Sequence, residues 1–384
     1  MDGVLRRREA GEAPEVSHVE LFFDLVYVFA ITQLSHSLHE HLTGRGALET
    51  LVLFLAVWWA WNYTAWATNW IEPAHAAVRL LLVGLMLVSL VMSASIPAAF
   101  GSRGLPFAAA YVGLQVVRSA FMVAAFAGTR MGRNYAQLLA WSCIAGAVWL
   151  GGAFADHEAR LWIWIAAVAI DYAAPLHGFA LPRMGRTPTR DWTLAGGHLA
   201  ERNQLLLLIA LGESILAIGA TLSGLTWSAS VLAAFGVGFV ATASFWWTYF
   251  GRAEAARSAV AQAADPTRVA RLGYAYAHGL MVAGVIVLAV AIDLTIAHPT
   301  REAWGSATAV ILGAPALYLV GNLLFKRALA GVVVWSRVLA LAALALLVPV
   351  AVVADRLALS TAAALVVIVL AATSGQGSAV ANRE

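Results

Sequence analysis

The sequence predicts an all-α polytopic membrane protein, with about twelve transmembrane helices in two parallel six-helix repeats. Of its 384 residues, 61% are hydrophobic and only 12% are charged, against about 45–50% and 25% in soluble domains. The mean hydropathy is +0.78, and the apolar residues come in blocks of about 20, long enough to cross a bilayer core of roughly 30 Å. This composition excludes a chain of soluble domains.

Clusters of arginine, proline and glycine separate the apolar blocks and define the expected spans. The first six are expected at residues 18–40, 47–70, 77–99, 105–127, 134–154 and 160–181, and the second six at 198–222, 229–250, 270–296, 304–325, 331–353 and 357–373. The expected segments are a tail (1–17), a first repeat (18–181), a linker (182–197), a second repeat (198–373) and a tail (374–384). Because Glu20 and Asp24 fall inside the first block, a cleavable signal is not expected there.

The distribution of positive charge predicts that both termini face the cytoplasm. Sixteen arginine and lysine residues fall in loops and tails on the side of the termini, and five fall in loops on the other side. Short loops rich in these residues stay on the cytoplasmic side of a membrane. The chain is therefore expected to be a multi-pass protein of the cell membrane with an even number of spans.

Three landmarks recur in the same order and predict an internal repeat. His18 and Glu20 open the first span, and His198 and Glu201 open the seventh. The paired residues Trp58-Trp59 and Trp246-Trp247 lie in the second and eighth spans, and Arg79-Leu80 and Arg271-Leu272 open the third and ninth. Because six is an even number, both halves would enter the membrane in the same direction. Chance similarity between apolar helices is the alternative.

Composition also argues against several kinds of partner. The net charge is +3 and the pI of 9.2 comes from arginines in loops, so nucleic-acid binding is not expected. Cys143 is the only cysteine, which excludes a disulfide within the chain and a thiolate metal cluster. His36, His39 and His41 with Glu40 lack a firm fourth ligand, so no metal is expected. The sequence identifies no cofactor; the expected partners are the lipid bilayer and a small-molecule or lipid substrate.

Ionisable side chains inside the spans form the candidate proton or substrate site, because such groups are costly in lipid and usually face protein or water. Glu20 and Asp24 lie four residues apart on one helical face, which Tyr27 continues. The full set of candidates is Glu20, Asp24, Tyr27, Arg118, Glu201, Arg202, Glu213 and His278. Most of them fall in the cytoplasmic half of their spans, so we expect one polar site between the two repeats.

The same residues also have a structural interpretation, in which buried acids and arginines pair to hold the bundle together. Glu20 and Asp24 could pair with either Arg118 or Arg202. For Arg118, the expected partner is Asp24 or Glu213, and the alternatives are Asp171 and backbone carbonyls. The interfacial histidines His18 and His198 are expected to be solvated or to cap helices.

Aromatic residues of the second span predict a cavity. Trp58, Trp59, Trp66 and Trp70 extend over about three helical turns, whereas an interfacial belt gathers at one depth. Packing against lipid is the alternative. The candidate cavity residues are Trp58, Trp59, Asn62, Trp66, Asn69, Trp246 and Trp247.

Two stretches resemble signatures of a known family, the bacterial low temperature requirement protein A family. They are Glu20-Leu-Phe-Phe-Asp24-Leu-Val-Tyr27-Val-Phe-Ala30 and Glu201-Arg202 followed by Leu211-Gly212-Glu213-Ser214-Ile215, and the Trp58-Trp59-Ala60-Trp61, Thr64, Asn69 pattern also fits. The resemblance covers residues 15 to 375 and implies a bacterial inner-membrane protein. Asn203-Gln204 departs from the family pattern, which has apolar or aromatic residues and glycine there. The family name describes growth in the cold and implies no reaction.

Two functions are compatible with these residues. A proton-linked transporter or permease for a small aromatic, cationic or amphipathic substrate would use the paired carboxylates to exchange a proton as access alternates. Against it, Pro97, Pro175 and Pro315 do not occupy matching positions in the two halves. An intramembrane enzyme acting on a lipid or isoprenoid would use an acid such as Asp24 or Glu213 and the aromatic faces for acid-initiated chemistry. A structural or sensory role is a third interpretation without a diagnostic feature.

Overall fold

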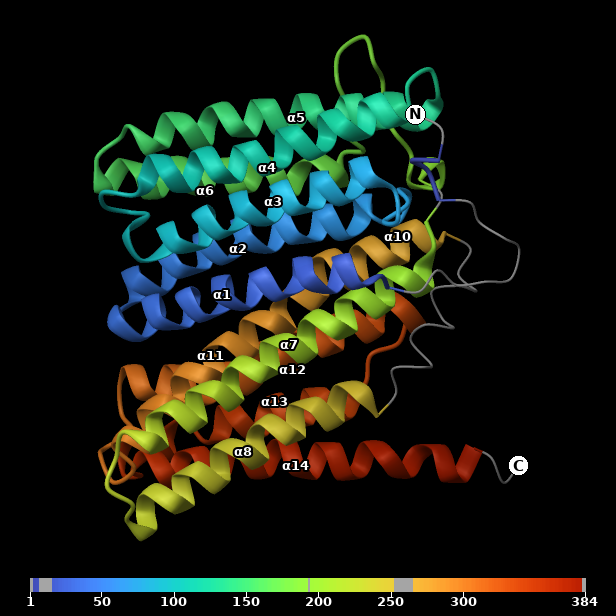
Figure 1. The fold of residues 1–384 in the computed structure, drawn as a ribbon. Coiled ribbons are helices and arrows are strands. Elements are labelled where there is room, and N and C mark those ends of the chain that lie inside the picture. Colours follow the sequence, from blue (N-terminus) through green and yellow to red (C-terminus); the bar gives the residue numbers. More distant parts are fainter. Residues whose placement is uncertain (1–2, 7–15, 193, 252–264, 382–384) are drawn as a thin grey trace. The chain divides into compact units, whose positions relative to one another are not determined.

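The computed structural model confirms the all-α membrane fold (Figure 1). It describes residues 3–6, 16–192, 194–251 and 265–381, where the long elements are helices and β pairing is confined to isolated bridges. The earlier elements are α1 (His18–Glu40), α2 (Gly44–Ala67), α3 (Ala76–Ser95), η1 (Ile96–Ala98), α4 (Gly104–Ala125), α5 (Arg130–Ala153), α6 (His157–Leu176) and η2 (Thr189–Asp191). The later ones are α7 (Gly196–Ser223), α8 (Ala229–Phe250), α10 (Pro266–Ala270), η3 (Arg271–Ala277), α11 (His278–Ala297), α12 (Ser306–Ala330), α13 (Trp335–Leu346), η4 (Pro349–Val352) and α14 (Arg356–Ala381).

Polar N-caps begin many of the helices where the apolar blocks begin. The side chains of Thr43, Thr129, Asp156 and Ser228 each accept a hydrogen bond from the backbone N–H three residues on. Such bonds satisfy donors that the first helical turn leaves free. Ser17 and Glu20 form a capping box at the start of α1.

Eleven helices of the described residues are long and apolar enough to cross a membrane. The expected span that is missing from these eleven is the second one, residues 47–70, which corresponds to α2. This helix is 24 residues long but carries Asn62, Tyr63 and several tryptophans. Most residues of α2 are buried. A helix shielded from lipid can carry more polar atoms, because these can bond to neighbouring helices.

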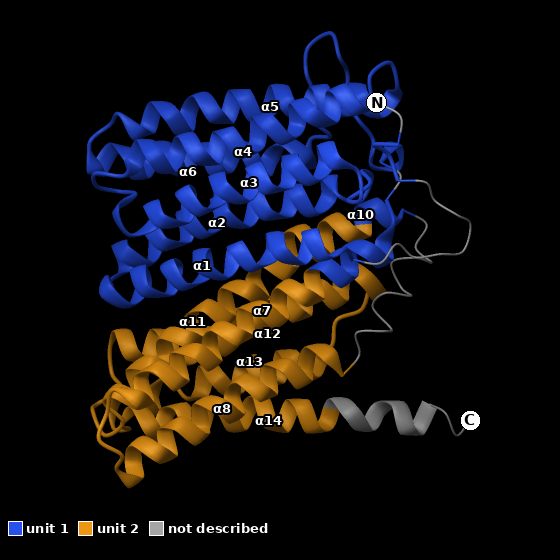
Figure 2. Ribbon diagram, in the orientation of Figure 1, with its two compact units in different colours: residues 1–202, 261–268 blue, residues 203–260, 269–384 orange. Residues whose placement is uncertain are grey.

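The chain divides into two compact units (Figure 2): residues 1–202 with 261–268, and residues 203–260 with 269–384. The division falls within α7, after Arg202, whereas the sequence suggested a boundary in the linker 182–197. The first turns of α7 belong to unit 1 because His198 and Arg202 bond to residues of α1 and to Thr68 and Asn69, which follow the end of α2.

Similar arrangements recur inside the two units. The neighbouring pairs α3–α4, α4–α5, α5–α6 and α2–α6 of unit 1 correspond in chain order to α11–α12, α12–α13, α13–α14 and α8–α14 of unit 2. In unit 1, Arg160 near the start of α6 donates to the carbonyl of Ala99, which follows α3 and η1. In unit 2, Arg356 at the start of α14 donates to the carbonyl of Leu294 near the end of α11. The internal repeat itself, its parallel orientation and the cytoplasmic termini stay predictions.

Candidate functional site

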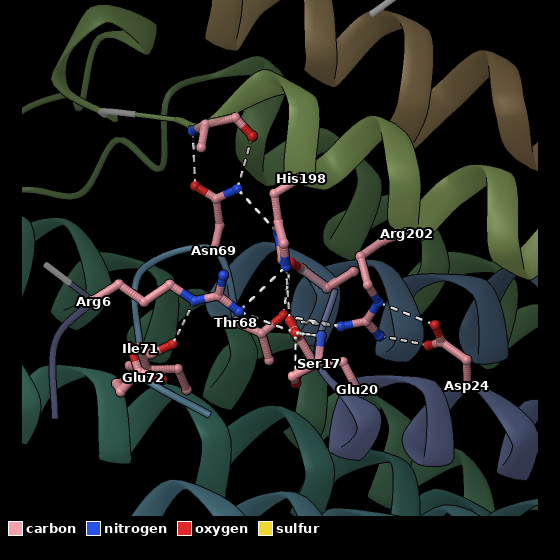
Figure 3. A network of polar contacts seen from close by, with 12 residues as sticks. Arg6, Ser17, Glu20, Asp24, Thr68, Asn69, Ile71, Glu72, His198 and Arg202 are labelled. Carbon is pink, nitrogen blue, oxygen red and sulfur yellow. Dashed lines mark hydrogen bonds and ion pairs between the residues drawn. The ribbon is translucent and has the colours of Figure 1, made fainter. Parts of the chain in front are cut away.

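A buried cluster of ion pairs lies in unit 1, where α1, α2 and the start of α7 meet (Figure 3). The spacing of four residues in α1 places Glu20 and Asp24 on one face. Arg202 comes from α7, and Arg6 comes from the N-terminal segment. Glu20, Asp24 and Arg202 are completely buried, so their charges must be balanced within the protein.

Arg202 binds both acids. Its Nη2 and Nε donate to Oδ1 and Oδ2 of Asp24 at 2.5 and 3.0 Å, and its Nη1 donates to Glu20 Oε1 at 3.2 Å and to Thr68 Oγ1 at 3.0 Å. Trp61 Nε1 donates to Asp24 Oδ1 at 2.7 Å. Both oxygens of Asp24 are therefore occupied, and the planar guanidinium holds the carboxylate at two points.

Besides Arg202, three residues bond to Glu20. Its Oε2 accepts hydrogen bonds from Arg6 Nη2 at 3.0 Å and from the backbone N–H and hydroxyl of Ser17 at 2.9 and 2.8 Å. Its Oε1 lies 2.9 Å from His198 Nε2. Glu20 thus caps α1 and anchors two other segments of the chain.

The bonds of Asn69 determine the tautomer of His198. Asn69 Oδ1 accepts from the backbone N–H of Ala195, and its Nδ2 donates to the carbonyl of Ala195, both at 2.9 Å. The amide N–H₂ therefore faces His198 Nδ1 at 3.3 Å, and Nδ1 must accept. The proton of the ring is on Nε2, which donates to Glu20, so His198 is neutral.

With His198 neutral, two arginines balance two carboxylates. This favours the structural interpretation of Glu20 and Asp24, with Arg202 and not Arg118 as their shared partner. A carboxylate held at both oxygens by a buried guanidinium is poorly placed to bind a substrate or to exchange a proton.

Arg118 lies in a second buried polar group of unit 1. It is 1% exposed, and no carboxylate oxygen of the described residues in unit 1 lies within 4.0 Å of its guanidinium. The expected ion pair with Asp24 is therefore wrong, because Arg202 occupies that acid; Glu213 belongs to unit 2. Arg118 bonds instead to Gln115 Oε1, Thr64 Oγ1 (3.3 Å) and the carbonyl of Ala60 (3.4 Å).

A hydrogen-bonded relay connects Arg118 to an acid. Gln115 Nε2 donates to the Tyr111 hydroxyl at 3.0 Å, and this hydroxyl donates to Asp171 Oδ2 at 2.7 Å. Trp149 Nε1 donates to the same oxygen at 3.0 Å. Tyr111, Gln115 and Arg118 share one face of α4 over about 10 Å, so the relay passes through the interior of the bundle. Asp171, at 7% exposed, is its least buried member.

Helix α2 contacts both arginines. Ala60 and Thr64 accept hydrogen bonds from Arg118, and the guanidinium carbon of Arg202 lies 5.9 Å from the centroid of the Trp61 ring. A change at either buried arginine can therefore reach the other through this helix.

The other candidates of unit 1 lie around this centre. Tyr27 is buried and accepts from Ser89 Oγ at 3.3 Å, so it does not extend the ion-pair cluster. Trp58, Trp59 and Asn62 are buried, Trp59 stacks on Tyr172 with ring centroids 4.0 Å apart, and Trp66 is half-buried. Glu201 is half-buried beside the completely buried Arg202. These aromatic residues of α2 thus pack in the interior of unit 1, and the cavity that they are expected to line stays a prediction.

Unit 2 holds the remaining candidates. His278 is completely buried, with Nε2 2.9 Å from the Tyr249 hydroxyl, and it directly follows the π-helical segment Arg271–Ala277. Glu213 is buried on α7. Trp246 and Trp247 are 42% and 59% exposed on α8, as suits a helix that meets lipid, and the cavity that they are expected to line stays a prediction.

Several residues of these groups were missed by the sequence interpretation. His198 was expected to be solvated or to cap a helix, and it is completely buried and bonded to Glu20 and Asn69. Arg6, Tyr111 and Gln115 were not selected, although the spacing of Tyr111, Gln115 and Arg118 on one helical face was a readable signal. Nothing in the sequence indicated that Arg6 is buried, because an arginine in a loop is ordinarily solvated.

Most of the chain is similar to known proteins. Residues 15–372 match the model of a family described as bacterial low temperature requirement A protein. An uncharacterized protein of Rhizobium meliloti (strain 1021) is 36% identical over 342 residues, which are 86% of this chain and 82% of the relative. No solved structure matches.

Proposed function

The chain belongs to the bacterial low temperature requirement A family, and from this premise we propose that it is a proton-linked transporter of a small organic solute. The family description names no reaction, so the support comes from geometry. The observation that carries the proposal is the relay from Asp171 through Tyr111 and Gln115 to Arg118. Chains of ionisable and hydroxyl groups inside membrane spans are typical of proton pathways.

In this mechanism Asp171, and not Asp24, carries the proton. Ionised Asp171 accepts from Tyr111 and Trp149 and offsets the charge of Arg118 across the relay. A proton on Asp171 removes that charge and competes for the Tyr111 hydroxyl, so Gln115 and Arg118 must change their bonds. Arg118 contacts Ala60 and Thr64, and the change therefore reaches α2.

The solute class is the one expected from the sequence, a small aromatic, cationic or amphipathic molecule. The buried Trp58 and Asn62 of α2 are candidates to contact it. The Asn62 Nδ2 is buried without a hydrogen-bond partner among the described residues, so it could donate to such a molecule.

The experiment has two steps. Metabolite profiles of cells and medium, with and without the protein, identify the solute. Uptake of that solute into proteoliposomes is then measured with and without an imposed pH gradient. Asp171→Asn is expected to lose at least tenfold of the gradient-driven uptake, whereas Asp156→Asn, on the same helix, keeps an N-cap and behaves as wild type.

Gradient-independent uptake by the wild type would contradict proton linkage, and the absence of any transported solute would contradict transport. One observation favours the enzyme alternative. Asp171 bonds to Trp149, whose ring is packed against Phe107, Tyr111 and Trp164, and such an acid beside aromatic faces suits acid-initiated chemistry on a lipid or isoprenoid. In that case the membrane lipids would change, with no solute difference between cells and medium.

A further inference from the structure

We propose that Arg6 is a tethered occupant of a cation-binding site in unit 1, and that the site binds a free guanidinium-type cation when the N-terminal segment leaves it. The site consists of the Glu20 carboxylate and the carbonyl of Ile71 (Figure 3). None of these residues belongs to the relay, so the site would exist whether or not the chain is a proton-linked transporter.

The described part of the N-terminal segment, residues 3–6, lies against residues 70–72, with Val4 buried and Arg6 bonded to Ile71 and Glu20. Arg6 N donates to the carbonyl of Trp70 at 3.0 Å, and Glu72 N donates to that of Val4 at 2.7 Å. Leu5 forms an isolated bridge with Ile71. A single bridge, two backbone hydrogen bonds and one buried apolar side chain, Val4, are a small attachment compared with a helix or a sheet, so the proposal requires only that this segment opens locally while the spans stay folded.

The charge balance requires a cation at this position. Glu20 and Asp24 carry two negative charges in complete burial, and Arg202 supplies one positive charge. His198 cannot readily supply the second, because Asn69 Nδ2 faces its Nδ1. Without Arg6, Glu20 would keep an unbalanced charge, which only a proton or an external cation could offset.

The arrangement of acceptors matches a planar cation. Arg6 Nε donates to the Ile71 carbonyl at 3.1 Å and Nη2 donates to Glu20 Oε2 at 3.0 Å, so two acceptors receive N–H groups from one guanidinium. The His198 Nε2 lies 3.4 Å from the same Nη2; both atoms carry hydrogen, so this is a contact and not a bond. A guanidinium has the forked donors for this geometry, whereas a quaternary ammonium ion has none.

The test is chemical rescue of Arg6→Ala in the purified full-length protein. We measure Tm in detergent with guanidinium chloride at about 10 mM, enough to fill a site with a millimolar Kd, and with tetramethylammonium chloride at the same concentration. Arg6→Ala is expected to lower Tm by roughly 10 °C, because it leaves a buried acid unbalanced. Guanidinium should restore at least half of this loss, and tetramethylammonium should not.

Two controls separate the site from general effects of salt. The wild type, whose site is filled by Arg6, and Arg6→Ala/Glu20→Gln, which lacks the acid, should not be stabilised by guanidinium. If Arg6→Ala does not accumulate, Arg6→Gln removes the charge but keeps an N–H donor, and guanidinium should raise its Tm. A wild-type Tm for Arg6→Ala, or no difference between guanidinium and tetramethylammonium in the variant that is recovered, would overturn the proposal.

Discussion

Arg202 and Asp24, 178 residues apart in the chain, form a two-point ion pair in which Nη2 and Nε of the arginine donate to the two carboxylate oxygens at 2.5 and 3.0 Å. This pair joins the first helix of the chain to α7. Both partners are inaccessible to solvent, so neither charge can be removed alone without leaving the other unbalanced.

Asp24→Asn should therefore destabilise the protein by roughly 3–5 kcal/mol, because Arg202 would remain buried without its main acid. The measurement is Tm in detergent together with abundance in the membrane. The double variant Asp24→Asn/Arg202→Gln removes both charges and should recover part of the loss. An Asp24→Asn protein with wild-type stability and no complementation of cold growth would instead make Asp24 a functional acid.

Gln115→Leu should destabilise unit 1 by about 1.5–3 kcal/mol, since Arg118 Nη2 would lose its acceptor in a buried position. Gln115→Glu supplies a carboxylate to the same arginine and should be at least as stable as the wild type. Under the proposed mechanism it should still lose gradient-driven uptake, because an ionised carboxylate at this position cannot donate to Tyr111. Equal stability of the leucine and glutamate variants would show that Arg118 does not depend on this contact.

Arg160→Lys should be destabilised by roughly 3 kcal/mol. The five N–H groups of Arg160 donate to the carbonyls of Gly152, Ala99, Gly101, Ala153 and Ala155, and a lysine has only three donors on a point charge. The matched control is Arg45→Ala at an exposed ion pair, which should behave as wild type. Thermal unfolding distinguishes the two, and an Arg160→Lys protein as stable as the wild type would mean that the carbonyls are satisfied in another way.

Gly284→Ala should push α11 and α12 apart. A Cβ at Gly284 would lie 2.7 Å from Tyr318 N and 2.9 Å from the carbonyl oxygen of Ala314, which are backbone atoms that cannot turn aside. We expect a loss of about 1–3 kcal/mol from this overpacking. At Gly313, on α12, an added Cβ meets nothing within 4 Å, so Gly313→Ala should be neutral or stabilising. A neutral Gly284→Ala would contradict the close approach of the two helices.

Many residues of the site could be identified from the sequence, but the pairs that they form could not. An acid or arginine within an apolar block is visible because lipid makes it costly, so Glu20, Asp24, Arg118 and Arg202 were all identified. Which acid meets which arginine depends on helix packing, and both Arg118 and Arg202 were compatible with Asp24 before the structure assigned it to Arg202. The role of His198 was also undecided, because a histidine at a span entrance looks the same in sequence whether it is solvated or buried.

The sequence by itself determined that the chain lies in a lipid bilayer, where its spans fall and to which family it belongs. These properties can be predicted because hydrophobic length and composition are local properties of the chain. Only the tertiary structure decided that α2 is an interior helix, that Trp246 and Trp247 face outward, and that Arg6 reaches Glu20. The physical reason is that lateral position in a bundle is set by contacts between helices distant in sequence. A tryptophan on a lipid face and one in the interior have the same hydropathy, and a loop arginine becomes a buried counter-ion only when the fold presents an acid to it.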